Sequence, residues 1–368
     1  MVLNEYVFII LWFGAVAVFA KCLPGLKKKE LVCGVEEERF PWWFVLLIMI
    51  PLVLAVANRP DGSDTYIYRR EFLNMPNELA EIGSYIEKIS KDKGFYFFSA
   101  LIRIFITHNS VVYFGILAAI QAISVFSIFR KYSSNFIISV FLFIASSDYV
   151  SWMFNGIRQF TAVTIVFAAT ALLLKKKYVP LILVIIFASL FHQSALIMLP
   201  IIFFVQGEAW NKKNVILILG VVIALSFVGS FTNLMEDTLQ TTQYKNVVSD
   251  YQSFDDDGTN PLRVAVYAVP AILSFIGRKK IKEADNELIN LCTNMSIISA
   301  GLYIVSMATS GIFLGRLPIY VSLYSYILLP WEIDNIFEED TKKTIYGALV
   351  VLYLIYYYYQ MHITYGAF

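Results

Sequence analysis

The sequence is poor in cysteine and in charge, and each shortage excludes a class of protein. Its three cysteines, Cys22, Cys33 and Cys292, are too few and too scattered for a disulfide framework or a metal site. Charged residues make up 15% of the chain and sum to a net charge of +1, with the basic residues in short clusters between apolar blocks. This pattern argues against nucleic acid as a partner. The sequence also has no internal repeat and no inverted pair of broken helices of the kind that secondary transporters use.

Apolar residues are abundant and fall in long blocks. Hydrophobic residues account for 58% of the 368 residues and aromatic residues for 16%, which is more than one soluble core could bury. The blocks are long enough to cross a bilayer core of ~30 Å. Residues 5–21 lack a basic n-region and a small-residue cleavage site, so they are interpreted as a retained span. The sequence therefore predicts an all-α polytopic membrane protein with a single integral-membrane domain over residues 1–368.

Clusters of lysine and arginine set the predicted orientation, because short loops rich in these residues stay in the cytoplasm. The clusters that adjoin apolar blocks are Lys27–Lys29, Arg130–Lys131, Lys175–Lys177, Lys212–Lys213, Arg278–Lys282 and Lys342–Lys343. Threading the chain through them predicts spans near 5–21, 41–57, 111–129, 135–151, 156–174, 178–191, 194–206, 214–232, 261–277, 288–308, 316–332 and 344–361. The result is about twelve transmembrane helices with both termini outside.

Two neighbouring spans in this scheme are short. As helices, 178–191 and 194–206 would extend only ~21 and ~20 Å, less than the thickness of a bilayer core. The turn between them contains His192 and Gln193. We therefore expect this turn to lie below the outer surface, in a wet hollow.

The outer face is expected to carry two long loops. A crossing at 94–107 would invert every later loop, so this segment is predicted as an interfacial or re-entrant helix within an extracytoplasmic loop over 58–110. The second extracytoplasmic loop, at 233–260, is acidic and includes Asp255–Asp257. It most resembles a solvated loop, with contact to a sugar or a divalent ion as the alternative.

Two polar motifs interrupt the apolar blocks on the predicted outer side. Asn155-Gly156-Ile157-Arg158-Gln159 opens one apolar helix, and Ala188-Ser189-Leu190-Phe191-His192-Gln193-Ser194-Ala195 lies between two others. A guanidinium in a bilayer-spanning segment costs roughly 2.5–3.5 kcal/mol, so such an arginine normally faces a cavity or a partner. The motifs therefore indicate chemistry inside the membrane region.

These two motifs, with a basic turn between them, resemble the central signature of the EpsG-like, Wzy-type polysaccharide polymerases. Gly62-Ser63-Asp64-Thr65-Tyr66 is similar to the family's Gly-Thr-Asp-Tyr element, with Ser63 and Thr65 in place of the usual Thr and Tyr around Asp64. Arg316-Leu317-Pro318-Ile319-Tyr320 is similar to its late Arg-Leu-x-x-Tyr element. The resemblance covers most of the chain in order.

The resemblance implies a reaction and an architecture. A growing O-antigen, capsule or exopolysaccharide glycan would pass from its undecaprenyl diphosphate carrier to the next lipid-linked repeat unit, at the outer face of the bacterial cytoplasmic membrane. The expected architecture is GT-C-like, and the expected partners are the two lipid-linked glycans, membrane lipid, a chain-length regulator and a flippase. No cofactor or metal is expected, because arginine stays charged and binds phosphate oxygens with a planar fork.

Arg158 is the first candidate for binding the diphosphate. If its helix begins near Asn155, then Asn155, Arg158 and Gln159 share one face at spacings of three and four residues. The alternative is an arginine that snorkels to the headgroups. His192 could donate to the diphosphate as an imidazolium, which we prefer, or accept the proton of the attacking sugar hydroxyl as a base. It could also be a satisfied structural histidine.

Other candidates come from the loops. Asp64 is the leading carboxylate for activating the acceptor hydroxyl, although Ser63-Asp64 is also an ordinary turn pair. Arg316 could supply a second cation to the diphosphate, with Tyr320 one turn further in, or it could simply anchor its span at the interface. The remaining arginines of the first outer loop could line the glycan path or neutralise nearby carboxylates; they are Arg59, Arg69, Arg70 and Arg103.

Two other functions stay open. A flippase or transporter for the same lipids would need a continuous polar path across the membrane, whereas the polar residues here gather on one side. A membrane acyltransferase would pair a buried histidine with a cytoplasmic donor pocket, and the charge rule places His192 near the other face. The preferred polymerase predicts one amphipathic hollow, open to the outer leaflet and lined by Arg158, His192 and Arg316.

Overall fold

A computed structural model of the protein describes residues 3–23, 25–32, 35–62, 64–227, 258–309, 311 and 314–364. Helices make up most of this described part. The chain divides into two compact units, the first comprising Met1–Leu172, Lys177–Leu196 and Glu339–Phe368, the second Leu173–Lys176 and Ile197–Glu338. No composition shift in the sequence indicates this division, because apolar helices build both units. The acidic loop predicted at 233–260 lies, up to residue 257, outside the described ranges.

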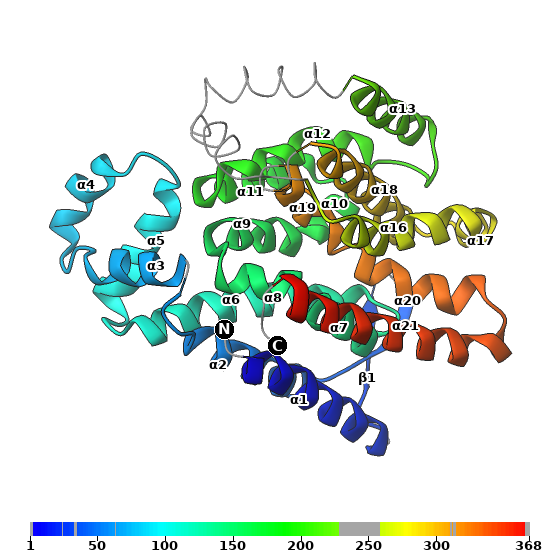
Figure 1. Ribbon diagram of the computed structural model, residues 1–368, viewed down its shortest axis with the longest axis horizontal. Coiled ribbons are helices and arrows are strands. Elements are labelled where there is room, and N and C mark those ends of the chain that lie inside the picture. Colours follow the sequence, from blue (N-terminus) through cyan, green and yellow to red (C-terminus); the bar gives the residue numbers. More distant parts are fainter. Residues whose placement is uncertain are drawn as a thin grey trace. The chain divides into compact units, whose positions relative to one another are not determined.

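The first unit is built from helices around a stack of four. Its helices are α1 (Leu3–Cys22), α2 (Trp42–Ala57), α3 (Asp64–Leu73), α4 (Leu79–Lys88), α5 (Lys93–Phe105), α6 (Ser110–Tyr132), α7 (Phe136–Ala145), α8 (Asp148–Phe154), α9 (Ile157–Ala168), the start of α10 (Thr170–Leu174), α11 (Tyr178–Phe191) and α21 (Glu339–Tyr359), which ends in a π-helical turn at Gln360–Thr364. In the stack, α2 packs on α6, α6 on α9, and α9 on α11. α7 packs against both α1 and α21 (Figure 1).

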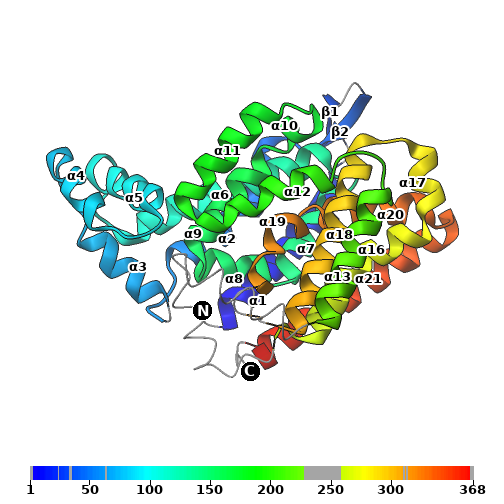
Figure 2. The same cartoon turned by 90° about the horizontal axis from the view of Figure 1, so that it is seen from above.

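The outer loop predicted over 58–110 is folded into helices. α3, α4 and α5 stand together at the left of Figures 1 and 2, and α5 contacts α3, α4, α6 and α11. Gly94 permits the approach of α5 to α11, because a Cβ atom at this glycine would lie 2.5 Å from the Leu190 Cβ. The helix predicted at 94–107 corresponds to α5, whereas α3 and α4 fall in the part that was predicted only as loop.

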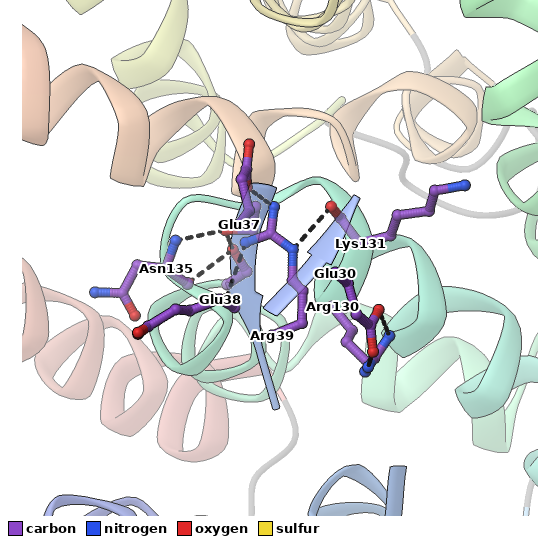
Figure 3. A network of polar contacts seen from close by, with 9 residues as sticks. Glu30, Glu37, Glu38, Arg39, Arg130, Lys131 and Asn135 are labelled. Atoms are coloured by element: carbon purple, nitrogen blue, oxygen red, sulfur yellow. Dashed lines mark hydrogen bonds and ion pairs between the residues drawn. The ribbon is translucent and has the colours of Figure 1, made fainter. Parts of the chain in front are cut away.

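A two-stranded hairpin follows α1, and the all-α prediction missed it. β1 (Lys28–Val32) and β2 (Val35–Arg39) pair antiparallel. Their sequences, Lys-Lys-Glu-Leu-Val and Val-Glu-Glu-Glu-Arg, show no alternation of apolar and polar residues that would indicate a strand. Glu30 of β1 forms an ion pair with Arg130 at the end of α6, which ties the hairpin to the rest of the unit (Figure 3).

The second unit surrounds α18. It comprises α12 (Met198–Phe204), α13 (Lys212–Ser226), α16 (Pro261–Ile276), α17 (Arg278–Ala284), α18 (Glu287–Met307), α19 (Ile319–Ser322), α20 (Ser325–Ile336) and the 3-10 turn η2 (Leu314–Arg316), while the 3-10 turn η1 (Gln193–Ile197) leads into it. α18 packs against α13, α16, α19 and α20 and is buried along most of its length. Figure 2 shows α13, α16 and α20 close to it.

Asparagine marks where several of the long helices begin. In five of the described helices the side chain of the N-cap asparagine accepts a hydrogen bond from the main-chain N–H of the second or third helical residue. These caps are Asn109 of α6, Asn135 of α7, Asn211 of α13, Asn260 of α16 and Asn286 of α18. Because each cap stands just before an apolar block, the predicted spans and the observed helices start at nearly the same residues.

Fewer helices than predicted are long enough to cross a membrane. Among the described residues three qualify by length and composition, namely Glu5–Cys22, Ser110–Tyr132 and Glu287–Met307. The number is five if each of two bent pairs is one span: α7 with α8, bent by 64°, and α16 with α17, bent by 69°. The protein is thus a helical membrane protein, whereas the count of about twelve crossings and the GT-C-like architecture stay predictions.

Candidate active site

The two polar motifs of the sequence meet in the first unit. Gln159 lies in the first turn of α9, and its Nε2 donates a hydrogen bond to the Ser194 Oγ at 3.3 Å. The same Ser194 Oγ lies 2.6 Å from Nδ1 of His192, the half-buried residue that caps the C-terminus of α11. Residues from both motifs therefore form one hydrogen-bonded chain, as their pairing in the sequence suggested.

A sharp break before α9 presents Arg158. α8 ends at Phe154, and the exposed Asn155 and then Gly156 separate it from α9. A Cβ atom on Gly156 would lie 2.0 Å from Cε3 of the Trp152 indole, so no larger residue fits without moving the ring. The glycine of this motif is explained by packing, because α8 folds back closely onto the break.

Arg59 supports this break from inside the protein. It is 2% exposed, and its Nη1 donates to the carbonyl oxygens of Met153 (3.2 Å) and Phe154 (2.6 Å). The guanidinium carbon lies 3.6 Å from the centroid of the Phe114 ring. Burial lowers the pKa of Arg59 to about 10. Arg59 therefore holds the last carbonyl groups of α8 and has little surface left for a ligand.

Arg158 is held between a carboxylate and two tyrosines. Its Nη1 donates to Asp92 Oδ2 at 2.9 Å, and its Nε lies 3.4 Å from the Tyr68 hydroxyl oxygen. The guanidinium carbon is 5.8 Å from the ring centroids of both Tyr68 and Tyr96, within cation–π range. The Arg158 side chain is 22% exposed and that of Asp92 is 4% exposed. The cation, and not the carboxylate, is therefore the accessible member of the pair.

Asp92 links three segments of the first unit. It stands at the N-terminus of α5 in a left-handed conformation, with φ of 56°. Burial raises the pKa of its carboxyl above the usual value, while Arg158, Lys91 and a backbone hydrogen bond with Gln193 act in the opposite direction. Asp92 thus connects α5 to the start of α9 and to the turn after α11. Sequence reasoning missed it, because a lone aspartate in a predicted loop carries no pattern.

A hollow adjoins Arg158 through Tyr96. It measures about 380 Å³ and is lined by Tyr66, Ile67, Arg70, Glu71, Asn74, Tyr85, Ile89 and Tyr96, a set that we call the tyrosine pocket. The Tyr96 hydroxyl donates to Glu71 Oε2 at 3.0 Å. Aromatic faces beside carboxylate, amide and guanidinium groups suit a ligand with both apolar faces and hydroxyl groups, such as a sugar. The sequence analysis named Arg70 as a candidate for the glycan path but missed the three tyrosines that line the same pocket.

The predicted base and the other loop arginines take different places. Asp64 opens α3 one turn before Tyr68, and its charge acts on both Tyr68 and Arg59. Arg69 forms an ion pair with the half-exposed Asp61 at 3.1 Å, and its Nη2 donates to the Arg59 carbonyl oxygen at 3.1 Å. Asp64 is therefore a neighbour of the Arg158 site through Tyr68, whereas Arg69 mainly ties the segment before α3 together.

Arg103 of α5 packs within the helical group of the first unit. Its guanidinium carbon lies 5.6 Å from the centroid of the Phe72 ring, and its Nε and Nη1 atoms are buried without a hydrogen-bond partner in the structure. This contact places the Arg103 side chain against protein. Its predicted contact with the glycan stays a prediction.

Arg316 and Tyr320 belong to the second unit. Arg316 is exposed at the end of the 3-10 turn η2, and Tyr320 is 1% exposed in α19. Arg316 therefore lies at the surface of the second unit, and Tyr320 lies in its core. That Arg316 shares a hollow with Arg158 and His192 stays a prediction.

Comparison with known proteins agrees with the motifs. The model of the EpsG family matches residues 42–367, a range that includes both polar motifs, Asp92 and the tyrosine pocket. No curated protein and no solved structure matches the chain. The family resemblance inferred from Asn155-Gly156-Ile157-Arg158-Gln159 and its partner motif is therefore confirmed. This chain belongs to the EpsG family of Wzy-like polysaccharide polymerases.

Proposed function

We propose that the protein is a polysaccharide polymerase that transfers a growing glycan from undecaprenyl diphosphate to the next lipid-linked repeat unit. The reaction takes place at the outer face of the bacterial cytoplasmic membrane, on the side opposite the lysine clusters. A single observation carries the proposal: Arg158 is an accessible cation held by a buried carboxylate, and it is joined to His192 through the Gln159–Ser194 contact.

The chemistry of the leaving group explains why a fixed arginine suits this reaction. As the bond between sugar and diphosphate breaks, negative charge grows on the diphosphate. A guanidinium that is already positioned stabilises that charge more in the transition state than in the ground state. Asp92 and the two tyrosines hold Arg158 in place and leave part of its fork accessible. In this proposal arginine supplies the electrostatic stabilisation, so the transfer does not call for a metal ion.

The other residues divide between donor and acceptor. His192 contacts the diphosphate beside Arg158, and Arg316 adds a second cation from the later part of the chain. Asp64, on the same helix as Tyr68, accepts the proton of the acceptor hydroxyl. The tyrosine pocket, which shares Tyr96 with the surroundings of Arg158, binds a sugar ring of the glycan. The donor lipid lies against the apolar helices.

Lipid-linked glycan from cells that lack the protein tests this function. We expect single unpolymerised repeat units on the carrier lipid, and restoration of long chains by the wild-type gene. Repeat units that accumulate only on the cytoplasmic side would instead indicate a flippase. Unchanged chain length together with loss of an acyl substituent would indicate an acyltransferase.

The proposed orientation of the protein in the membrane can be tested separately. Single cysteines at positions 70 and 280 are placed in a cysteine-free background and treated with an impermeant reagent. Labelling at position 70 in intact cells, and at 280 only after membrane disruption, is the expected result. The reverse pattern would place the Arg158 site on the cytoplasmic side and contradict the proposed reaction.

A further inference from the structure

A large cavity in the first unit shares no residue with the candidate active site. It measures about 1420 Å³ and lies between α1, α7 and α21, with β2 and the chain before β1 at one end. Phe141 of α7 forms its base, because this ring contacts Phe13 of α1 at 6.3 Å and Tyr353 of α21 at 6.4 Å between centroids. α7 therefore holds the two outer helices apart, and the cavity is the space between them.

The cavity is as long as one bilayer leaflet. Along α1 its lining runs from Lys21 back to Ile10, and along α21 it runs from Lys343 to Leu354. At 1.5 Å per residue each wall is ~17 Å long, about half of a ~30 Å bilayer core. Apolar residues on both walls stay exposed, with Leu11 at 66% and Val351 at 55%. Such walls give an acyl chain lateral access from the bilayer.

Positive charge gathers at one end of the cavity. The C-terminal end of α1 and the N-terminal ends of α7 and α21 meet there, and the lining includes Lys21, Lys27 and Lys343. None of these lysines forms an ion pair with a carboxylate in the described part of the chain. Among the described lining residues Glu38 is the one carboxylate. This end of the cavity therefore carries more positive than negative charge.

The neighbouring arginines are already neutralised. Arg39 forms an ion pair with Glu37 and donates from Nε to the Lys131 carbonyl oxygen at 3.1 Å (Figure 3). Arg130 binds Glu30 with both terminal nitrogens. The hairpin network thus accounts for both arginines and leaves the three lysines for an external anion.

We propose that this cavity binds one anionic phospholipid of the cytoplasmic leaflet. Its phosphate lies among Lys21, Lys27 and Lys343, and its acyl chains lie along α1 and α21 above Phe141. The lysine clusters place this end of the cavity in the cytoplasm, where anionic headgroups attract basic residues. The inference rests on charge and on cavity length, and it does not depend on the polymerase reaction.

Glycines in the cavity wall allow a direct test. Gly14 of α1 and Gly347 of α21 line the cavity, and a Cβ atom at either would meet no protein atom within 4 Å. Gly347→Leu therefore adds apolar volume to the cavity wall at a position where the Cβ atom meets no protein atom. Gly220→Leu is the matched control, because Gly220 is a helical glycine of α13 that has equally open surroundings and lies outside the cavity.

The measurement is native mass spectrometry of the purified full-length protein. The protein is titrated with phosphatidylglycerol and, in a second arm, with phosphatidylcholine of the same acyl chains. We expect one retained phosphatidylglycerol, with affinity lowered about tenfold or more in a Lys21→Gln/Lys27→Gln/Lys343→Gln variant. Gly347→Leu should abolish retention, and Gly220→Leu should leave it unchanged.

Three outcomes would overturn the proposal. They are equal retention of the two lipids by wild type, retention unaffected by Gly347→Leu, and an equal loss in a Lys212→Gln/Lys279→Gln/Lys280→Gln control, which would indicate diffuse surface attraction. A dimer that dissociates in Gly347→Leu would assign the cavity to a second copy of the chain instead. Because lipid retention is the readout, polymer length does not enter the result.

Discussion

Two of the arginine–carboxylate pairs described in the first unit are arranged in opposite ways. In the pair at the start of α9, Arg158 is 22% exposed and Asp92 is 4% exposed. In the pair at the end of α6, Arg130 is 7% exposed and Glu30 is 42% exposed. Similar chemistry therefore presents a cation in one place and a carboxylate in the other. An exposed cation can bind an external anion, whereas a buried cation can only hold its own protein together.

The surroundings of the two arginines agree with this difference. Arg158 lies between two tyrosine rings and keeps part of its fork accessible. Arg130 binds Glu30 with both terminal nitrogens, a contact drawn in Figure 3, and its Nε donates to the Phe40 carbonyl oxygen. An arginine near the end of a predicted span therefore does not by itself indicate an anion-binding site. The exposure of the arginine relative to its partner separates the two roles.

Replacement of Arg158 should have the largest effect. Arg158→Lys keeps the charge but loses the planar fork, so we expect polymer formation to fall about 100-fold or more at unchanged membrane abundance. The matched control is Arg130→Lys, which should lower abundance while each folded molecule polymerises normally. Chain length of extracted glycan, normalised to membrane protein, measures both. Equal loss of turnover in the two variants would contradict the different roles of Arg158 and Arg130.

Removal of the carboxylates should have a smaller effect and a different one at each site. Asp92→Asn leaves Arg158 without its counter-charge, so the fork loses its fixed position and polymer formation should fall about tenfold. Glu30→Gln changes a residue that is outside the Arg158 site, so it should leave turnover unchanged. The assay is the same as for the arginines. Normal chains from Asp92→Asn would mean that the tyrosines alone position Arg158.

The same two ion pairs should respond differently to acidic pH. The pKa of Asp92 is raised, mainly by burial, whereas the pKa of Glu30 is lowered, mainly by its hydrogen bond with Arg130. As the pH falls from neutral, Asp92 protonates first, and polymer formation in membrane vesicles should fall at a pH above the usual aspartate value of about 3.9. Asp92→Asn should lack this inflection. An identical profile in wild type and variant would assign the inflection to another group.

The pKa shifts of Asp92 and Glu30 make the stability of the protein depend on pH in opposite directions. Because the folded-state pKa of Asp92 lies above its unfolded value, its contribution to stability is greatest below the unfolded pKa and is lost as the pH rises through the folded pKa. The lowered pKa of Glu30 gives a contribution that is present above its unfolded pKa and is lost as the pH falls through the folded pKa. Thermal unfolding of Asp92→Asn and Glu30→Gln across acidic pH checks both directions.

Packing at the break before α9 can be tested through stability. Gly156→Ala places a methyl group on the Trp152 indole and should destabilise the protein by about 1–3 kcal/mol. Gly83→Ala is the control, because Gly83 lies in α4 with open space around it, and alanine there should stabilise by about 0.4–1 kcal/mol. The thermal unfolding midpoints of the two variants, measured on detergent-solubilised protein, check both expectations. Two neutral substitutions would show that Trp152 moves freely and that the break is not tightly packed.

The smallest expected effect concerns the tyrosine pocket. Tyr66 and Tyr358 are both 56% exposed, but Tyr66 lines the tyrosine pocket and Tyr358 lies on α21. Tyr66→Ala should weaken glycan binding about fivefold, because it removes an aromatic face, and Tyr358→Ala should not. Binding of purified repeat-unit oligosaccharide measures the difference. Equal affinity in the two variants would show that the tyrosine pocket does not bind the sugar.

Local patterns in the sequence predicted the membrane class, the positions of most helices and the two central motifs. α11 has the predicted bounds 178–191, and α1, α2, α16 and α18 begin and end within two residues of the predicted spans. The reason is that an apolar block and its N-cap are contiguous in the chain. We also predicted that Arg158 and His192 lie near each other, because both fall at the outer ends of predicted spans.

Tertiary structure alone decided how the site is built. Asp92 and Arg158 are 66 residues apart, and Arg59 reaches carbonyl groups that lie 94 and 95 residues further along the chain. Such pairs leave no periodicity in the sequence, because they depend on how α5, α8 and α9 pack. The same holds for the opposite exposure of Arg158 and Arg130, and for the cavity between α1 and α21. The sequence determined which side chains carry charge, and packing decided which of those charges face outward.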